Sequence, residues 1–118
     1  MISQFLWEMQ KGNAPVIYGD GTQTRDFTYV NDIISACTLM IKKPFNYNIL
    51  NVGTGHAYNF NEIVEILNSK LQTKIKPTYV KIPMNNYVDH TLADITKIKK
   101  LGYTPKFNIY QGIDELIK

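Results

Sequence analysis

The sequence is poor in the residues that define several classes of site. It holds one cysteine, Cys37, so no internal disulfide can form, and we interpret this thiol as a small buried apolar residue rather than a nucleophile. The two histidines, His56 and His90, lie far apart and match no zinc pattern. No apolar run approaches the roughly eighteen residues of a membrane span, and residues 1–12 lack the layout of a signal peptide. These absences predict a cytoplasmic protein that binds no metal.

Charge and length set further limits. Thirteen basic and ten acidic residues give a net charge of +3. The lysines are scattered and not interleaved with aromatic residues, so nucleic acid is not predicted as a partner. A chain of 118 residues can bury one core but is short for an enzyme with separate cofactor and substrate domains. We expect one domain or fragment over residues 1–118.

Hydrophobic periodicity predicts an alternating organisation of the α/β or α+β class. The expected helices cover residues 3–11, 30–42, 60–71, 94–102 and the segment after Asn108. The expected strands cover residues 15–18, 26–29, 47–52 and 74–82. Asn59 and Glu62 predict a capping box before the third helix, Asp94 and Asn108 predict caps for the last two helices, and Pro44 ends the second.

The helix expected over residues 30–42 carries a continuous apolar stripe. Its members recur at helical spacing: Val30, Ile33, Ile34, Cys37, Met40 and Ile41. A stripe of this length needs a partner surface.

Residues 53–58 read Gly-Thr-Gly-His-Ala-Tyr, which is a near match to the glycine-rich fingerprint of dinucleotide-binding sites. The third glycine is replaced by Tyr58, and no acidic residue follows about twenty positions later. We interpret these glycines as a tight turn before a helix. No cofactor site is expected in this chain.

Arg25 is the only arginine in a lysine-rich chain, and it follows a Gly-Asp-Gly turn at residues 19–21. A guanidinium donates two parallel N–H bonds to phosphate or carboxylate oxygens, which a lysine ammonium does not. Two interpretations stay open. Arg25 is either an anion clamp or the partner of Asp20 or Asp26 in a surface ion pair worth about 0–1 kcal/mol.

Three segments in order resemble the C-terminal part of extended short-chain dehydrogenase/reductases that act on nucleotide sugars. They read PVIYGDGTQTRDFTYVNDI at 15–33, YNILNVGTG at 47–55 and ADITKIKKLGYTP at 93–105. The resemblance implies a substrate-binding part that lacks the N-terminal Rossmann core. In that family the missing half binds NAD and carries a Tyr-x-x-x-Lys pair, and no tyrosine here has a lysine four residues later. The resemblance therefore implies no catalytic residue, no cofactor held by this chain, and no turnover by the chain alone.

The same resemblance implies a substrate site. In the family, the backbone before the Gly-Asp-Gly turn contacts the nucleotide base and the following arginine contacts the diphosphate. Many members carry a second arginine where this chain has Met84, so the hydroxyls of Tyr87 and Thr91 are candidates for phosphate or sugar. The implied substrate-binding residues are Val16, Ile17, Tyr18, Arg25, Tyr87 and Thr91.

The implied activity is that of an NAD-dependent epimerase or dehydratase of nucleotide-diphosphate sugars. It resembles UDP-glucose 4-epimerases or, over residues 87–94, ADP-heptose epimerases. In the family, the helix at 30–42 packs on the cofactor half, so we expect its stripe to be uncovered here. We therefore expect self-association or binding of the missing half. The alternative is a stand-alone nucleotide- or anion-binding module, or a remnant that works with a separate partner chain.

Overall fold

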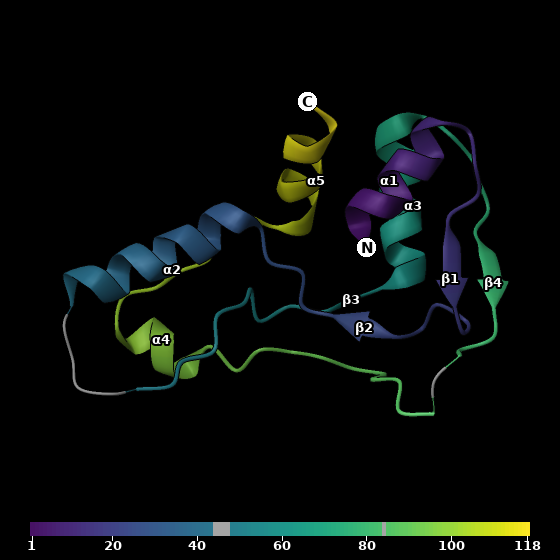
Figure 1. Ribbon diagram of the computed structural model, residues 1–118. Helices are drawn as coiled ribbons and strands as arrows, with labels where there is room; N and C mark the ends of the chain where they lie inside the picture. Colours follow the sequence, from purple (N-terminus) through teal and green to yellow (C-terminus); the bar gives the residue numbers. More distant parts are fainter. Residues whose placement is uncertain (44–47, 84) are drawn as a thin grey trace.

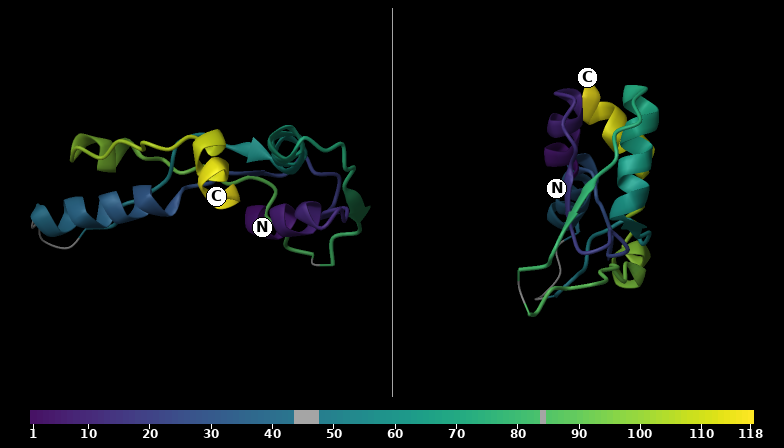
Figure 2. Two further views of the ribbon diagram at one scale, coloured as in Figure 1. Left: turned by 90° about the horizontal axis from the view of Figure 1, so that it is seen from above. Right: turned by 90° about the vertical axis from the view of Figure 1, so that its right-hand side faces the viewer.

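The computed structural model describes residues 1–43, 48–83 and 85–118 and shows a flat, elongated molecule (Figures 1 and 2). Pro44, Tyr47 and Met84 lie outside the described residues. The principal extents are 48 × 37 × 16 Å, and the radius of gyration is 16.4 Å. A compact domain of this length has a radius of gyration of about 13–14 Å. The molecule is therefore less compact than a domain that covers its own surface.

The accessible surface leads to the same conclusion. It measures 7947 Å², whereas a compact monomer of this mass exposes about 6,600 Å². The difference, on the order of 1,000 Å², is similar to the area that one partner buries in a stable protein interface.

Three helices enclose the main hydrophobic core, and we call this region the helical core. They are α1 (Ile2–Gln10), α3 (Phe60–Leu71) and α5 (Ile109–Ile117), which lie side by side in Figure 2. Apolar residues at helical spacing give each helix one buried stripe. The buried residues are Phe5, Leu6, Met9, Ile17, Phe60, Ile63, Val64, Ile66, Leu67, Ile109 and Ile113.

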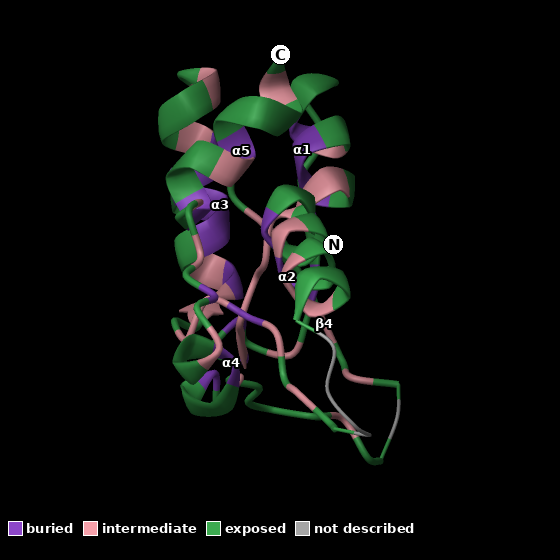
Figure 3. Cartoon of the chain, turned by 90° about the vertical axis from the view of Figure 1, so that its left-hand side faces the viewer, coloured by how far each residue is buried: buried purple, intermediate pink, exposed green. Residues whose placement is uncertain are grey.

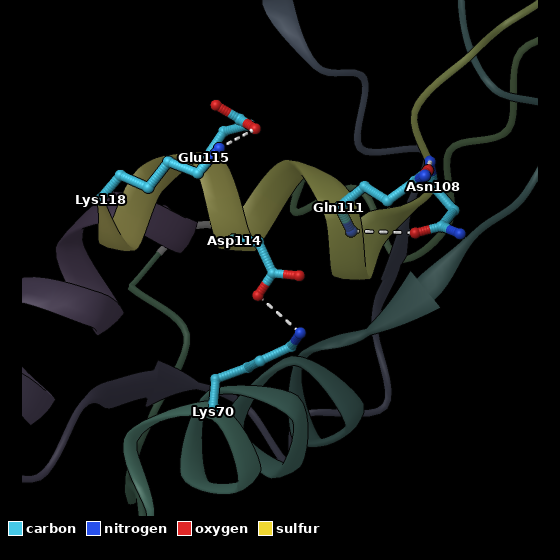
Figure 4. A network of polar contacts seen from close by, with 6 residues as sticks. All are labelled: Lys70, Asn108, Gln111, Asp114, Glu115 and Lys118. Atoms are coloured by element: carbon cyan, nitrogen blue, oxygen red, sulfur yellow. Dashed lines mark hydrogen bonds and ion pairs between the residues drawn. The ribbon is translucent and has the colours of Figure 1, made fainter.

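Capping boxes begin two of these helices. Asn59 Oδ1 accepts a hydrogen bond from the Glu62 N–H at 2.8 Å, and the Glu62 carboxylate accepts one from the Asn59 N–H at 2.7 Å. Asn108 and Gln111 repeat this exchange at the start of α5, at 2.9 and 3.0 Å (Figure 4). The predicted box before α3 and the predicted cap of α5 are confirmed.

Two small sheets lie beside the helices. β1 (Val16–Tyr18) pairs in parallel with β4 (Thr78–Val80), and β2 (Thr24–Arg25) pairs in antiparallel register with β3 (Tyr58–Asn59). Ile17 anchors β1 in the core. The mixture of helices and short strands confirms the α/β, or α+β, fold class.

The strands are shorter than the sequence predicts. Residues 26–29 and the described part of the segment 47–52 form no strand, and the last expected strand is reduced to Thr78–Val80. Side chains take the place of a partner strand. Asn68, for example, accepts from the Ile75 N–H at 2.8 Å and donates to the Ile75 carbonyl at 2.9 Å. Alternating hydrophobicity indicates which side of a segment is buried, but it does not indicate which groups form hydrogen bonds with the backbone of that segment.

A second region, which we call the arm, extends from the helical core (Figure 1). It contains α2 (Val30–Lys42) and α4 (Thr96–Lys100). Its small core consists of Ala36, Ile95, Ile98 and Tyr103. Asp32, only 1% exposed, ties α2 to the segment before α5, because its carboxylate accepts the N–H groups of Lys106 at 2.9 Å and Phe107 at 3.1 Å.

The apolar stripe of α2 faces solvent. Val30, Ile34 and Ile41 are 57%, 55% and 82% exposed, and Figure 3 shows α2 largely in the colours of exposed and intermediate residues. Cys37 is also exposed, so its predicted burial is wrong. The reason is that α2 turns the side carrying Ala36 toward the small core. The expectation of an uncovered stripe is confirmed for these residues, whereas Met40, another member of the stripe, packs against the small core.

The N-cap of α4 is Ile95, whose carbonyl accepts the Lys99 N–H at 3.0 Å, so the predicted cap at Asp94 is wrong by one residue. Asp94 precedes the N-cap, and its Oδ1 accepts the Thr96 N–H at 2.9 Å. Hydrogen bonds from the Thr96 side chain and backbone lower the pKa of Asp94. The helix ends at Lys100, earlier than expected, in a tight turn closed by the N–H groups of Leu101 and Gly102. Among the helices of the described residues, none is both long and apolar enough to span a bilayer.

Candidate functional site

The Gly-Asp-Gly turn at residues 19–21 is held by its own side chain and docked on α3. Asp20 Oδ1 accepts from the N–H and the hydroxyl of Thr22 at 3.0 and 2.7 Å, and these bonds lower the pKa of Asp20. The two glycines have φ of +83° and +81°, in the left-handed region that favours glycine. The carbonyl of the second glycine accepts the Phe60 N–H at 3.0 Å. The turn therefore has a fixed position at the start of α3.

Arg25 follows this turn at the end of β2, and its guanidinium contacts backbone carbonyls. Nη1 donates to the carbonyls of Thr24 at 2.7 Å and Asp89 at 3.1 Å, and Nη2 donates to the carbonyl of Val88. A guanidinium has five N–H donors. Two of them, on Nε and Nη2, have no acceptor among the residues that the structure describes. Two donors are the number that a bidentate pair of phosphate or carboxylate oxygens requires.

Aromatic rings flank the same guanidinium. The ring centroids of Phe60 and Tyr87 each lie 5.6 Å from Arg25 Cζ, within the range of a cation–π contact. The structure thus brings Arg25 and Tyr87 together from distant parts of the chain. Arg25 forms no ion pair with any described residue, so its interpretation as a surface partner of Asp20 or Asp26 is wrong.

Residues 87–93 run beside β2, and we call them the strap. Thr24 holds the strap in three ways. Its N–H donates to the Asp89 carbonyl at 2.9 Å, its carbonyl accepts the Thr91 N–H at 3.1 Å, and its hydroxyl lies 3.0 Å from His90 Nδ1. Together with the Arg25 bonds, these contacts fix the strap next to the turn.

Asp26 connects the segments of the site, whereas the sequence suggested for its side chain only an ion pair with Arg25. Its Oδ1 accepts from the Thr54 N–H and hydroxyl at 2.9 and 2.6 Å, and its Oδ2 accepts from the N–H groups of Gly55 at 2.9 Å and Ala93 at 3.3 Å. The carboxylate therefore joins the 53–55 turn to the strap. It also occupies the amides that a dinucleotide phosphate would need, which supports the interpretation of these glycines as a structural turn.

The remaining candidates lie on β1 and the strap. Ile17 points into the core, while Val16 and Tyr18 are 46% and 47% exposed. Thr91 lines a separate surface cavity of about 450 Å³ with Asp26, Leu50, Asn51, Val52, Leu92 and Ala93. Arg25 does not line that cavity. The structure therefore groups Tyr87, but not Thr91, with Arg25.

One edge of β1 is available to a ligand. The Pro15 carbonyl accepts the Thr78 N–H at 2.9 Å, and the Gly19 N–H donates to the Val80 carbonyl at 2.8 Å, so these groups face β4. Because successive backbone groups of a strand point to opposite edges, the N–H and C=O groups of Val16 and Tyr18 point away from β4. No other described strand pairs with that edge.

Within the described residues, no cluster of three or more His, Cys, Asp or Glu side chains has an arrangement that could hold a metal ion. Backbone carbonyls surround the Arg25 guanidinium, and the neighbouring residues add the Thr24 hydroxyl, the His90 imidazole and the Asp26 carboxylate. This arrangement can bind an anion and can hydrogen-bond a planar ligand along a strand edge.

Comparisons with known proteins identify a family for this chain. Residues 1–116 match the family model of GDP-mannose 4,6 dehydratase. A putative UDP-glucose 4-epimerase of Methanocaldococcus jannaschii is 33% identical over 117 residues, which are 99% of this chain and 37% of that protein.

Two solved structures share the fold of this chain. The UDP-glucose 4-epimerase of Thermotoga maritima with UDP-glucose gives a TM-score of 0.90 at 30% identity, covering 98% of this chain and 37% of that one. The UDP-glucuronic acid 4-epimerase of Bacillus cereus with UDP-glucuronic acid and NAD gives 0.89 at 26% identity, covering 97% and 37%. The chain thus spans little more than a third of the length of these relatives.

Proposed function

The chain belongs to the GDP-mannose 4,6 dehydratase family, within the NAD-dependent extended short-chain dehydrogenase/reductases, and from this premise we propose that it binds the nucleotide diphosphate of a sugar substrate. It is the nucleotide-sugar-binding portion of an epimerase or dehydratase, related to the UDP-glucose or ADP-heptose epimerases. The observation that carries the proposal is the Arg25 guanidinium, which lies within cation–π range of two aromatic rings and keeps two N–H donors free of described acceptors.

Arg25 binds the diphosphate in this proposal. A diphosphate offers oxygen pairs at the spacing of a guanidinium fork, and each charge-assisted hydrogen bond contributes about 1.5–3 kcal/mol. The ring of Tyr87 lies beside Arg25, and its hydroxyl is a further donor for phosphate or sugar. Thr91, at its separate cavity, is the weaker candidate of the two hydroxyls.

The outer edge of β1 binds the base. The C=O of Val16 and the N–H of Tyr18 flank Ile17 on this edge and form an acceptor–donor pair. A strand edge of this kind supplies directional hydrogen bonds to a planar ligand. The exposed ring of Tyr18 adds a flat apolar face for the base.

A single domain over residues 1–118 would then work beside a separate NAD-binding half. We place that half on the exposed stripe of α2, because the stripe is apolar and the chain exposes more surface than a compact domain does. Binding energy from the diphosphate would position the sugar for hydride transfer in the other half. This chain would supply binding and no catalytic group.

One observation favours a second candidate. The helical core has its own buried interior and two capped helices, so this region has what a stand-alone nucleotide- or anion-binding module needs. Both candidates require the same ligand site. They differ only in whether a partner chain covers α2.

The site is tested by titrating the chain with UDP in a calorimeter. We expect Arg25→Lys to weaken binding about tenfold, because an ammonium loses the fork geometry that one charge-assisted bond depends on. Lys97→Met is the matched control, since it removes a cation from the exposed surface of α4 and is expected to change the affinity less than twofold. Equal affinities of the wild type and Arg25→Lys would show that Arg25 does not clamp the diphosphate.

A further inference from the structure

Gln23 is a buried amide whose hydrogen bonding is incomplete. Gln23 is 4% exposed, and its Nε2 donates to the Tyr18 carbonyl. Its Oε1 is buried and has no hydrogen-bond donor among the described residues. Burying an acceptor without a donor is unfavourable. An apolar side chain of the same length would avoid that cost. We therefore attribute the presence of an amide at this position to the hydrogen bond that its N–H group donates.

The N–H of Gln23 holds the peptide unit between Tyr18 and Gly19. The carbonyl of this unit accepts from Gln23, and its N–H donates to the Val80 carbonyl at 2.8 Å. Gly19 makes room for the amide, because a Cβ at this position would collide with Gln23 Nε2. The last peptide unit of β1 is therefore held by a hydrogen bond on each side.

The bond from Gln23 changes which hydrogen-bonding groups the outer edge of β1 presents to a ligand. Without Gln23, the edge would present two acceptors, the carbonyls of Val16 and Tyr18, on either side of the Tyr18 N–H. Gln23 occupies the second acceptor and leaves three groups in order along the edge: the Val16 N–H, the Val16 C=O and the Tyr18 N–H. Nucleobases carry hydrogen-bond donors and acceptors side by side on their edges, so adjacent groups of this kind match a base.

We propose that Gln23 is a positioning residue that fixes the β1 edge for a nucleobase, through its bond to the Tyr18 carbonyl. It does not touch the ligand. The inference rests on the proposed function, and it adds that recognition of the base depends on Gln23 while recognition of the phosphates depends on Arg25.

The test compares two ligands, UDP and inorganic pyrophosphate, by calorimetry on the full chain. Gln23→Met keeps the length of the side chain, removes the donor and removes the unpartnered Oε1, so it is expected to fold. We expect it to weaken UDP binding at least fivefold and pyrophosphate binding less than twofold. Arg25→Lys is expected to weaken both. Gln10→Met, the same substitution at the exposed end of α1, is the control and is expected to change neither.

Amide hydrogen exchange provides a readout that needs no ligand. In Gln23→Met the Gly19 amide is expected to exchange at least fivefold faster, because its peptide unit has lost one anchor, whereas the amides of α3 keep their rates. An unchanged Gly19 rate overturns the proposal.

The remaining outcomes separate this inference from the proposed function. Equal weakening of UDP and pyrophosphate by Gln23→Met overturns the positioning role, and so does an unchanged UDP affinity. A wild type that binds pyrophosphate as tightly as UDP overturns the base contact itself, and with it the role of Gln23. A wild type that binds neither ligand overturns the proposed function. Failures of the proposed function thus appear in the wild type, and failures of the inference appear in the variant.

Discussion

The helical core and the arm contain amphipathic helices of nearly equal length with very different surroundings. The twelve-residue helix α3 buries five apolar residues, whereas the thirteen-residue helix α2 buries only Asp32 and Ala36. Two helices, α1 and α5, contribute buried residues to the core around α3, while the arm has only the short helix α4 and nearby loops. An apolar stripe indicates that a helix needs a partner surface, but the rest of the chain determines whether such a surface is present.

Cohesion in the arm therefore depends more on polar groups. Asp32 holds two backbone N–H groups, and the Tyr103 hydroxyl donates to the Gly53 carbonyl at 3.0 Å. Burial, with smaller effects from Asp32 and Asp26, raises the pKa of Tyr103 above its usual value of 10.0. These bonds fix a loop-rich region that has little apolar interior of its own.

The comparison between α3 and α2 is most sharply tested by the same substitution in both. Ile63→Ala, at a site with 0% exposure, is expected to lower the free energy of unfolding by about 2–5 kcal/mol, because it leaves a cavity. Ile41→Ala, at 82% exposure, is expected to change it by less than about 0.5 kcal/mol. Urea denaturation followed by circular dichroism measures both. Similar changes at the two sites would mean that α2 is covered in solution.

A second pair of substitutions tests the polar cohesion of the arm. Asp32→Ala is expected to destabilise the chain by about 1–3 kcal/mol, because two partly buried N–H groups lose their acceptor. Asp114→Ala removes the ion pair with Lys70, 2.6 Å long and partly exposed, which joins α3 to α5 (Figure 4). Its expected cost is about 0–1 kcal/mol. Thermal melting of both variants shows which substitution lowers the stability more. A larger loss of stability in Asp114→Ala than in Asp32→Ala would contradict the prediction.

The smallest expected effect on stability concerns the exposed stripe itself. Replacing Ile34 and Ile41 by Glu is expected to leave the fold intact but to abolish self-association, because charges replace the apolar contact. Light scattering at high protein concentration measures this. Replacing Asn31 and Thr38 by Glu adds the same charges at exposed sites on the same helix and serves as the control. A wild type that stays monomeric at high concentration contradicts self-association through α2.

Local patterns in the sequence predict the helices well and the strands poorly. Helices α2 and α3 and the caps of α3 and α5 agree with the structure because spacing and capping act within a few residues. Two expected strands are missing because strand formation requires a partner from elsewhere in the chain. The burial expected for Cys37 failed for the same reason, since the facing element is not encoded near it.

The site divides in the same way. The glycine turn and the singular arginine are visible as residues, and their spacing is sufficient to propose an anion site. The bonds of Arg25 to the strap, the four-donor role of Asp26 and the incomplete amide of Gln23 join positions up to 67 residues apart or depend on burial. Nothing in the local sequence signals them, although an acidic residue in an expected half-buried strand was a partial sign for Asp26.

The amino-acid order alone therefore determined which segments are helical, where α3 and α5 begin, and that one guanidinium follows a glycine turn, because these features depend on neighbours within one or two turns of chain. Only the tertiary structure decided which stripe is covered and which N–H donors of Arg25 meet an acceptor among the described residues. Both features depend on groups that are distant in the sequence. A carbonyl or carboxylate that accepts a hydrogen bond from an N–H group makes that N–H unavailable to a ligand.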